Sequence, residues 1–84
     1  MTEQDHTHPS PDVTLDAQGL FCPEPVMMLH RAMRPMAPGQ VLELLATDPS
    51  TTRDVPKFCL LLGHQLVHQE QDGSIYRYLL RKTG

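Results

Sequence analysis

The sequence predicts an α/β two-layer sandwich in which two helices cover one face of a four-stranded mixed sheet, in the order β-α-β-α-β-β. Three observations lead to this fold class. Four segments carry apolar residues in strand-like patterns, at residues 13–17, 41–47, 64–71 and 75–81. Proline-containing helix-start signals stand between the first three of these segments. An Asp72-Gly73 pair, typical of a hairpin turn, joins the last two.

The first strand and the first helix follow from the pattern of residues 12–34. Apolar and polar residues alternate from Val13 to Ala17, which indicates a strand with one buried face. A Gln18-Gly19 turn leads to a Cys-Pro-Glu-Pro segment at residues 22–25. The prolines favour a helix start, because the first N–H groups of a helix have no acceptor within it. We expect a buried helix face of Val26, Leu29 and Met33, ended by Pro35 and Pro38-Gly39.

The second strand and the second helix are predicted in the same way. Residues 41–47 (VLELLAT) are apolar enough for an interior strand, with Glu43 as the one charged position. Asp48-Pro49 is typical of a cap followed by the first helical residue. Because residues 54–56 repeat this start signal, we expect a helix that is broken or bent near Pro56 and ends at Gly63.

Length and composition limit the classes of function. The chain has 84 residues and a formal net charge of −3, which is enough for one domain with a thin core and lacks the basic surface of a general nucleic-acid binder. We therefore expect no direct nucleic-acid binding. We also expect no membrane span and a cytoplasmic location, because no apolar run is long enough to span a bilayer and residues 1–11 lack the apolar segment of a secretory signal.

The chain divides into an expected disordered tail, residues 1–11, and a domain at residues 12–84. The tail carries His6 and His8. Two histidines without a third ligand are a weak metal-binding signal, so we expect no metal and no resident cofactor.

The two cysteines stand in different settings. Cys22 precedes a helix, whose free N–H groups and macrodipole favour a thiolate or persulfide anion and lower the pKa of a thiol. Pro23 and Pro25 stiffen this helix start and hold the sulfur outward. Glu24 acts in the opposite direction, since a neighbouring negative charge raises the pKa, and the sequence leaves the balance open. Cys59 lies inside an apolar helix and is expected to be an inert buried thiol.

The sequence lacks the machinery of a self-sufficient cysteine enzyme. Such enzymes pair the thiol with a base, usually histidine, and His30 is two helical turns from Cys22. No phosphate-binding loop, paired-carboxylate site or zinc ligand set is present. This favours a carrier whose partners supply the chemistry.

Two sequence blocks resemble the TusA family of sulfur carriers, also called the SirA-like family. The first block is LDAQGLFCPEPVMM at residues 15–28, in which the Cys-Pro-x-Pro element follows Leu-Asp-x-x-Gly-Leu. The second is DPSTTRDVP at residues 48–56, and the C-terminal Asp72-Gly73 and YRYL of residues 76–79 also match. The resemblance extends from about Val13 to the end of the chain.

This resemblance implies a persulfide relay and the same two-layer fold. Sulfur from a cysteine desulfurase would be accepted on Cys22 and passed to a TusBCD-type acceptor complex, for 2-thiolation of the wobble uridine of certain tRNAs. Relatives also supply sulfur for molybdenum-cofactor synthesis and sulfur oxidation. Two positions depart from the family pattern: Phe21 stands where relatives often have a basic or polar residue, and Thr47 stands where close relatives have an acid.

The candidate docking surface for partners surrounds Cys22. Glu24 and Met27 are expected to flank the sulfur on the exposed side of the first helix, although a wide apolar stripe would bury Met27. Asp48 and Arg53 follow the second strand, whose end lies beside the Cys22 turn if the first two strands are parallel. Asp48 also has a competing role as a helix cap, whereas Arg53 has no local duty in the sequence.

Two other classes of function compete with the carrier. A redox or regulatory thiol protein would oxidise Cys22, and it would benefit from a resolving cysteine, which a buried Cys59 does not provide. An RNA-binding module is disfavoured by the acidic charge and the scarcity of aromatic residues.

Overall fold

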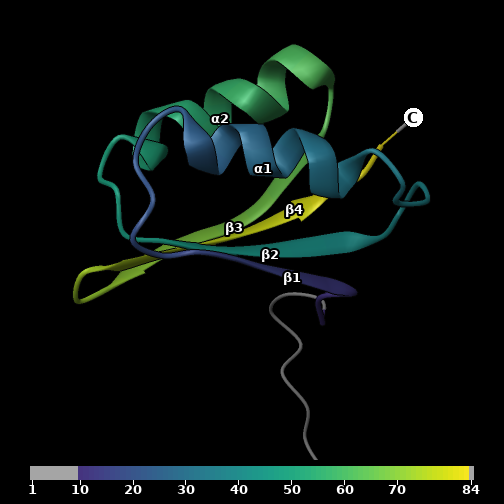
Figure 1. The fold of residues 1–84 in the computed structure, drawn as a ribbon. Helices are drawn as coiled ribbons and strands as arrows, with labels where there is room; N and C mark the ends of the chain where they lie inside the picture. Colours follow the sequence, from purple (N-terminus) through teal and green to yellow (C-terminus); the bar gives the residue numbers. More distant parts are fainter. Residues whose placement is uncertain (1–9, 84) are drawn as a thin grey trace, which may run out of the picture.

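The computed structural model describes residues 10–83. Figure 1 shows both helices on the same side of the sheet, which confirms the predicted two-layer sandwich. The greater part of the expected tail, residues 1–9 with His6 and His8, lies outside the described residues. Within residues 10–83, no helix is long and apolar enough to cross a membrane. The elements are β1 (Val13–Ala17), α1 (Glu24–Met33), β2 (Val41–Ala46), α2 (Thr51–Leu62), β3 (Gln65–Asp72) and β4 (Ile75–Arg81).

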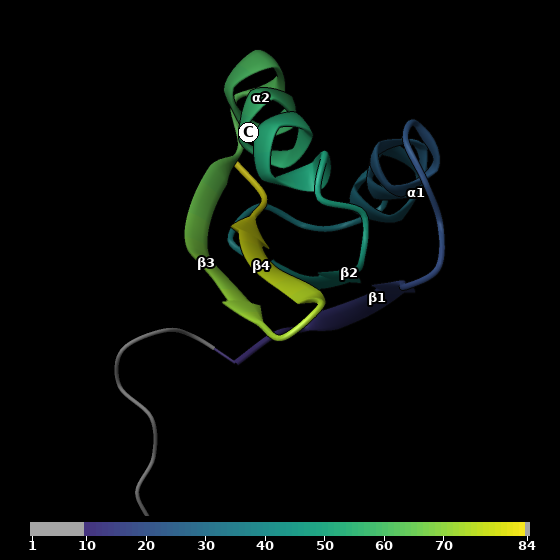
Figure 2. The same ribbon diagram turned by 90° about the vertical axis from the view of Figure 1, so that its left-hand side faces the viewer.

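The sheet is mixed, with the strand order β1-β2-β4-β3. β1 and β2 are parallel, from Val13 opposite Leu42 to Ala17 opposite Ala46, and β4 is antiparallel to both of its neighbours. Figure 2 shows α1 above the β1 side of the sheet and α2 above the β3–β4 side. Because β1 and β2 run in the same direction, the turns that follow them meet at one end of the molecule.

The core lies between the helices and the sheet. α1 contributes Leu29 and Met33, and α2 contributes Val55, Phe58 and Cys59, all of which are buried. The buried hydroxyl of Tyr78 lies 2.8 Å from Oγ1 of Thr51, so each of these polar groups has a partner. The sheet side chains that complete the core include Ala17, Leu42, Leu44, Tyr78 and Leu80.

Glu43, the charged residue of the interior strand β2, is paired with Arg77 of β4. Glu43 Oε2 accepts a hydrogen bond from Nε of Arg77 at 2.5 Å, and Glu43 Oε1 accepts one from Thr14 Oγ1. Nη1 of Arg77 also lies 3.4 Å from Oε2 of Glu70 on β3. Leu42 and Leu44, on either side of Glu43, belong to the core. Because successive side chains of a strand point to opposite faces, Glu43 lies on the face away from the helices.

The second helix corrects two expectations from the sequence. It begins at Thr51, after a turn that contains Pro49, and it continues through Pro56 as one helix rather than breaking there. Pro56 has no N–H to donate to the carbonyl of Thr52, yet the helix continues on both sides of it. The helix ends at Gly63, where φ is +76°, a conformation that suits glycine at a helix C-terminus.

Candidate functional site

Cys22 lies in the turn between β1 and α1, and its side chain is exposed. Pro23 is the N-cap of α1 and Pro25 stands in its first turn. The helix begins at once: Glu24 N–H donates to Phe21 O at 2.8 Å, and Met27 N–H donates to Pro23 O at 3.0 Å. The Cys22–Pro23 peptide bond is cis. The sulfur is thus presented at a helix start, as the sequence predicts.

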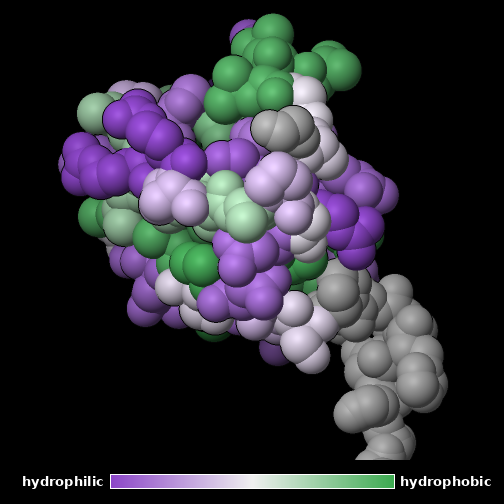
Figure 3. Space-filling model, turned by 90° about the vertical axis from the view of Figure 1, so that its right-hand side faces the viewer, coloured by the Kyte–Doolittle hydropathy of each residue, from purple (hydrophilic) through white to green (hydrophobic). Residues whose placement is uncertain are grey.

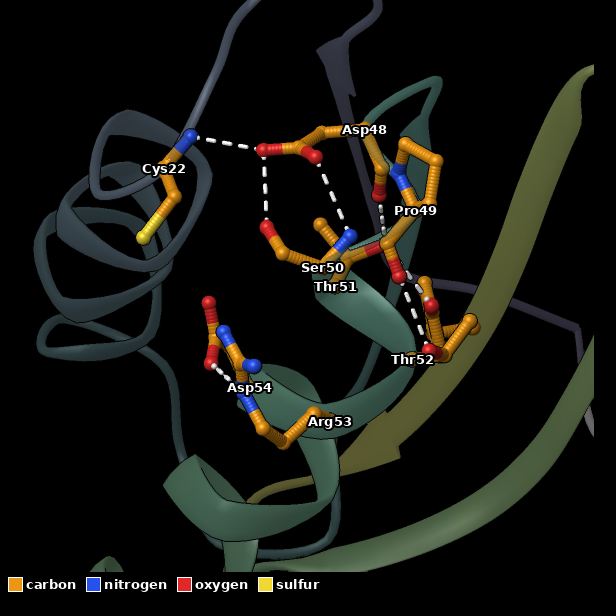
Figure 4. Close-up of polar contacts among 9 residues, drawn as sticks. Cys22, Asp48, Pro49, Ser50, Thr51, Thr52, Arg53 and Asp54 are labelled. Carbon is orange, nitrogen blue, oxygen red and sulfur yellow. Dashed lines mark hydrogen bonds and ion pairs between the residues drawn. The ribbon is translucent and has the colours of Figure 1, made fainter.

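Asp48 fastens the Cys22 turn to the turn that follows β2. Its carboxylate accepts three hydrogen bonds, from Cys22 N–H at 2.7 Å, from Ser50 N–H at 3.0 Å and from Ser50 Oγ at 2.8 Å (Figure 4). The hydrogen bonds from Ser50 and Cys22 hold the pKa of Asp48 below its ordinary value. Asp48 is only 8% exposed, so its carboxylate serves this internal connection and is poorly available to a partner.

A second hydrogen bond joins the same two turns. Gly19 N–H donates to Oγ1 of Thr47 at 2.8 Å. The threonine that departs from the family pattern therefore has a structural contact of its own. With two such hydrogen bonds, the backbone around Cys22 is fixed from the side of β2.

The Cys22 side chain opens onto a groove between α1 and α2. The groove has a volume of about 360 Å³ and is mostly apolar. The ring of His30 meets the ring of Phe58 edge-on, with ring centroids 4.8 Å apart, between the two helices. The lining residues are Cys22, Pro23, Val26 and His30 from the α1 side, and Asp54, Lys57, Phe58, Leu61 and Leu62 from α2.

Asp54 dominates the electrostatics of the thiol. The Asp54 carboxylate is the largest cause that raises the pKa of Cys22, and partial desolvation and the charge of Asp48 raise it further. Arg53 lowers it, but by less. The balance that the sequence leaves open between the helix start and a nearby acid therefore favours a raised pKa. The decisive acid is Asp54, which α2 brings toward the sulfur, and not the sequence neighbour Glu24 (Figure 4).

The predicted docking residues differ in their availability. Glu24 is exposed, and Met27 is 54% exposed, which decides against its burial in the core. The Arg53 side chain is 74% exposed, yet its Nε lies 3.1 Å from Oδ1 of Asp54. Arg53 therefore has a local partner, contrary to the expectation that it has none.

Several large apolar side chains are exposed in this part of the molecule, and those of α2 were not among the predicted docking residues. Figure 3 shows an apolar cluster where α2 ends. Phe21, which precedes Cys22 in the sequence, and Met27 of α1 add exposed apolar surface. The helical repeat gives the signal for two of the residues of α2: Val55, Phe58 and Cys59 share the buried face, so Leu60 and Leu61 turn outward. Leu62 falls on the same face as Phe58 and is nevertheless 45% exposed.

Cys59 is buried, as predicted. It is 4% exposed within the core, and burial raises its pKa to about 11. Among the described residues 10–83, no group of three or more histidine, cysteine, aspartate or glutamate side chains is placed to hold a metal ion.

The fold and the site define a small two-layer α/β protein that presents one exposed cysteine at the rim of a groove between its helices. Residues 13–82 match the family model described as sulfurtransferase TusA. Sulfur carrier proteins TusA from Pseudomonas paraeruginosa and Pseudomonas aeruginosa are each 59% identical over 76 residues, which cover 90% of this chain and 95% of the relative. The chain belongs to the TusA sulfurtransferase family.

A third curated relative agrees with this assignment, and a solved structure shares the fold. The sulfur carrier protein TusA of Pseudomonas entomophila is 59% identical over 71 residues, or 84% of this chain and 89% of that protein. The crystal structure of a SirA-like protein from Desulfitobacterium hafniense superposes with a TM-score of 0.73, covering 86% of this chain and 99% of that one. Its sequence identity is 23%, so this likeness concerns the fold alone.

Proposed function

We propose that this TusA-family protein carries sulfur as a persulfide on Cys22, accepting it from a cysteine desulfurase and passing it to a partner protein. The observation that carries the proposal is the contrast in exposure between the exposed Cys22 and the buried Cys59. Only an exposed sulfur can be reached by a second protein without unfolding of the carrier.

The transfer needs no cofactor. The Cys22 sulfur attacks the terminal sulfur of the donor's cysteine persulfide, so that a new S–S bond forms on Cys22 while the donor's S–S bond breaks. The donor cysteine departs as a thiolate and takes up the proton that Cys22 gives up. A thiolate of the acceptor then repeats the same attack on the Cys22 persulfide. The protein is a sulfurtransferase in this sense of a relay.

The surroundings of Cys22 suit docking by other proteins. Large exposed apolar side chains lie on both helices: Met27 is exposed on α1, and Leu61 of α2 lines the groove. Exposed apolar side chains that gather into one patch mark sites of protein interaction. Glu24 and Arg53 supply charges around them, and charges at the rim of an interface set its orientation and association rate.

The most direct test of the carrier role is intact-mass spectrometry after incubation with a cysteine desulfurase and cysteine. The parent protein should gain the mass of one sulfur atom, which a thiol reductant removes. Cys22→Ser should gain none, and Cys59→Ala should gain as much as the parent. Sulfur bound to Cys59 in the Cys22→Ser protein would contradict the proposal.

For the final acceptor, we propose a TusBCD-type complex and 2-thiolation of the tRNA wobble uridine. The support is the high identity to curated TusA carriers over nearly the whole chain. Cells that lack this protein should lose 2-thiouridine from their tRNA, and the Cys22→Ser protein should not restore it. If thiolation persists while molybdenum-cofactor enzymes or sulfur oxidation fail, the sulfur goes to one of those pathways instead.

The competing redox function gains no support from the site. The pKa of Cys22 is raised, which reduces the fraction of thiolate available for oxidation. Cys59 is buried in the core and cannot act as a resolving cysteine without unfolding.

A further inference from the structure

The acidic residue that faces the thiol belongs to a different helix from the cysteine. Asp54 stands in the first turn of α2 and lines the groove together with Cys22. Figure 4 shows the sulfur of Cys22 and the carboxylate of Asp54 directed into the same space between the helices. The Asp54 side chain is 19% exposed, so water screens its charge less than it screens the charge of an open surface carboxylate.

The other charged groups around Cys22 are differently placed. Asp48 is occupied by its three hydrogen bonds, one of which goes to the backbone of Cys22 rather than to its sulfur. Arg53 approaches Asp54 through its Nε, so that the carboxylate lies between the guanidinium group and the thiol. Lys57 and His30 line the groove, and Glu24 follows Pro23 at the exposed start of α1.

We propose that Asp54 is the positioning residue of the Cys22 thiol: its carboxylate faces the sulfur across the groove, accepts the thiol hydrogen bond and makes the unloaded thiol less reactive. Arg53 moderates this effect by pairing with the same carboxylate. The raised pKa of Cys22, with Asp54 as its largest cause and Arg53 opposing it, agrees with this arrangement.

The consequence for sulfur transfer rests on the proposed function. A protonated thiol reacts slowly with general electrophiles, because the thiolate is the nucleophile. During loading, the S–S bond of the donor persulfide breaks as the bond to Cys22 forms, and the Cys22 proton ends on the departing donor cysteine. No oxidant or reductant is consumed. Asp54 thus lowers the fraction of Cys22 thiolate that is open to electrophiles other than the donor.

The test measures the pH dependence of Cys22 alkylation by iodoacetamide on the reduced, full-length protein, with the label located by peptide mass. Asp54→Asn removes the negative charge, so the pH at which the alkylation rate reaches half of its maximum should fall. This pH is called the midpoint below. At about pH 7.5 alkylation should be roughly two- to fourfold faster, since the gain in thiolate outweighs the accompanying loss of nucleophilicity. Arg53→Gln should move the midpoint in the opposite direction.

Glu24→Gln is the matched control, because it removes the same charge from a residue adjacent to Cys22 in the sequence. It should move the midpoint less than Asp54→Asn does. Equal midpoints for Asp54→Asn and the parent would overturn the proposal, and so would an equal shift in Glu24→Gln. If Asp54→Asn fails to fold by circular dichroism, Arg53→Gln decides: an unchanged or lower midpoint overturns the proposal.

This measurement needs no sulfur donor, so its outcome is independent of the carrier role. If the parent protein accepts no sulfur, the proposed carrier function is contradicted, but the proposed role of Asp54 is not. Unchanged midpoints together with normal sulfur loading would remove the role of Asp54 alone.

Discussion

The two cysteines of this domain show how far the surroundings of one residue type determine its chemistry. Cys22 lies in an exposed turn at the start of α1, whereas Cys59 lies in the third turn of α2 and is 4% exposed. The backbone of Cys22 is tied to Asp48 at 2.7 Å while its sulfur faces the groove. The sulfur of Cys59 is enclosed by core side chains.

The cause of the raised pKa also differs between the two cysteines. At Cys22 it is mainly a nearby carboxylate, Asp54, which a partner or a substitution can change. At Cys59 it is burial alone, which changes only when the domain opens. A reversible sulfur carrier requires a thiol whose pKa depends on a nearby group, as at Cys22. A cysteine that only packs in the core tolerates a pKa raised by burial, as at Cys59.

The largest expected difference between the two cysteines is in their rate of chemical modification. In native conditions iodoacetamide should label Cys22 only, because Cys59 is reached only when the core opens. Labelling of Cys59 should be slower by a factor of at least about 10³, on the scale of the folding equilibrium of a small domain. Peptide mass spectrometry over a time course measures both rates. Comparable rates at the two sites would show that the core around Cys59 opens locally.

A second prediction removes the connection that fixes the Cys22 turn. Asp48→Ala leaves the N–H groups of Cys22 and Ser50 without their acceptor, so it should lower Tm and speed the hydrogen exchange of the Cys22 amide. Asp16→Ala is the matched control, since the Asp16 carboxylate accepts one N–H, from Gln18, at an exposed site. It should affect Tm less than Asp48→Ala does.

The contribution of Asp48 should also depend on pH. Its pKa is lowered in the folded protein, so its stabilisation is complete above the ordinary carboxyl pKa of 3.8 and is lost as the pH falls through the folded value. The difference in Tm between the parent and Asp48→Ala should therefore shrink in acid. A difference that stays constant from pH 7 to about pH 3 would show that the carboxylate charge is not involved.

Much of this site could be predicted from the sequence, because its position depends on local signals. The helix start at Pro23 and Pro25, the burial of Cys59 and the parallel pairing that brings Asp48 beside Cys22 each follow from residue type and order. The prolines restrict the backbone, and apolar surroundings predict burial.

The rest of the site depends on distances that the sequence does not contain. Asp54 is 32 positions from Cys22 in the sequence, and its approach to the thiol depends on how α1 and α2 pack. The continuous course of α2 through Pro56 is a case of tertiary packing prevailing over a local signal, because Val55, Phe58 and Cys59 bury one face on both sides of the proline. This also directs Leu60 and Leu61 outward.

A third prediction concerns the charge at the rim of the groove. Arg53→Glu should weaken binding to the desulfurase or to the acceptor by several-fold, mainly through slower association. The fold should be unaffected, since an exposed ion pair contributes only about 0–1 kcal/mol. The sequence alone predicts unchanged thiol reactivity in this variant, but the contact between Arg53 and Asp54 predicts slower alkylation of Cys22.

Calorimetry with the desulfurase and with the acceptor measures the loss of binding affinity. Arg31→Glu is the control, because it makes the same change of charge on α1 at an exposed residue that does not line the groove. Equal affinities of the parent and Arg53→Glu for both partners would exclude Arg53 from the docking surface.

The smallest effect is expected at Cys59, and it tests whether this cysteine has any role beyond packing. Cys59→Ala removes a buried sulfur from the core and should lower the free energy of unfolding by roughly 1 kcal/mol, on the scale of a small truncation. Sulfur loading on Cys22 should stay at the parent level, because the two sulfurs have separate surroundings: Cys59 does not line the groove. Urea unfolding and intact-mass measurement on the same sample give both quantities. A Cys59→Ala protein that unfolds like the parent yet accepts no sulfur would show that Cys59 takes part in the relay, and the contrast between the two cysteines would no longer hold.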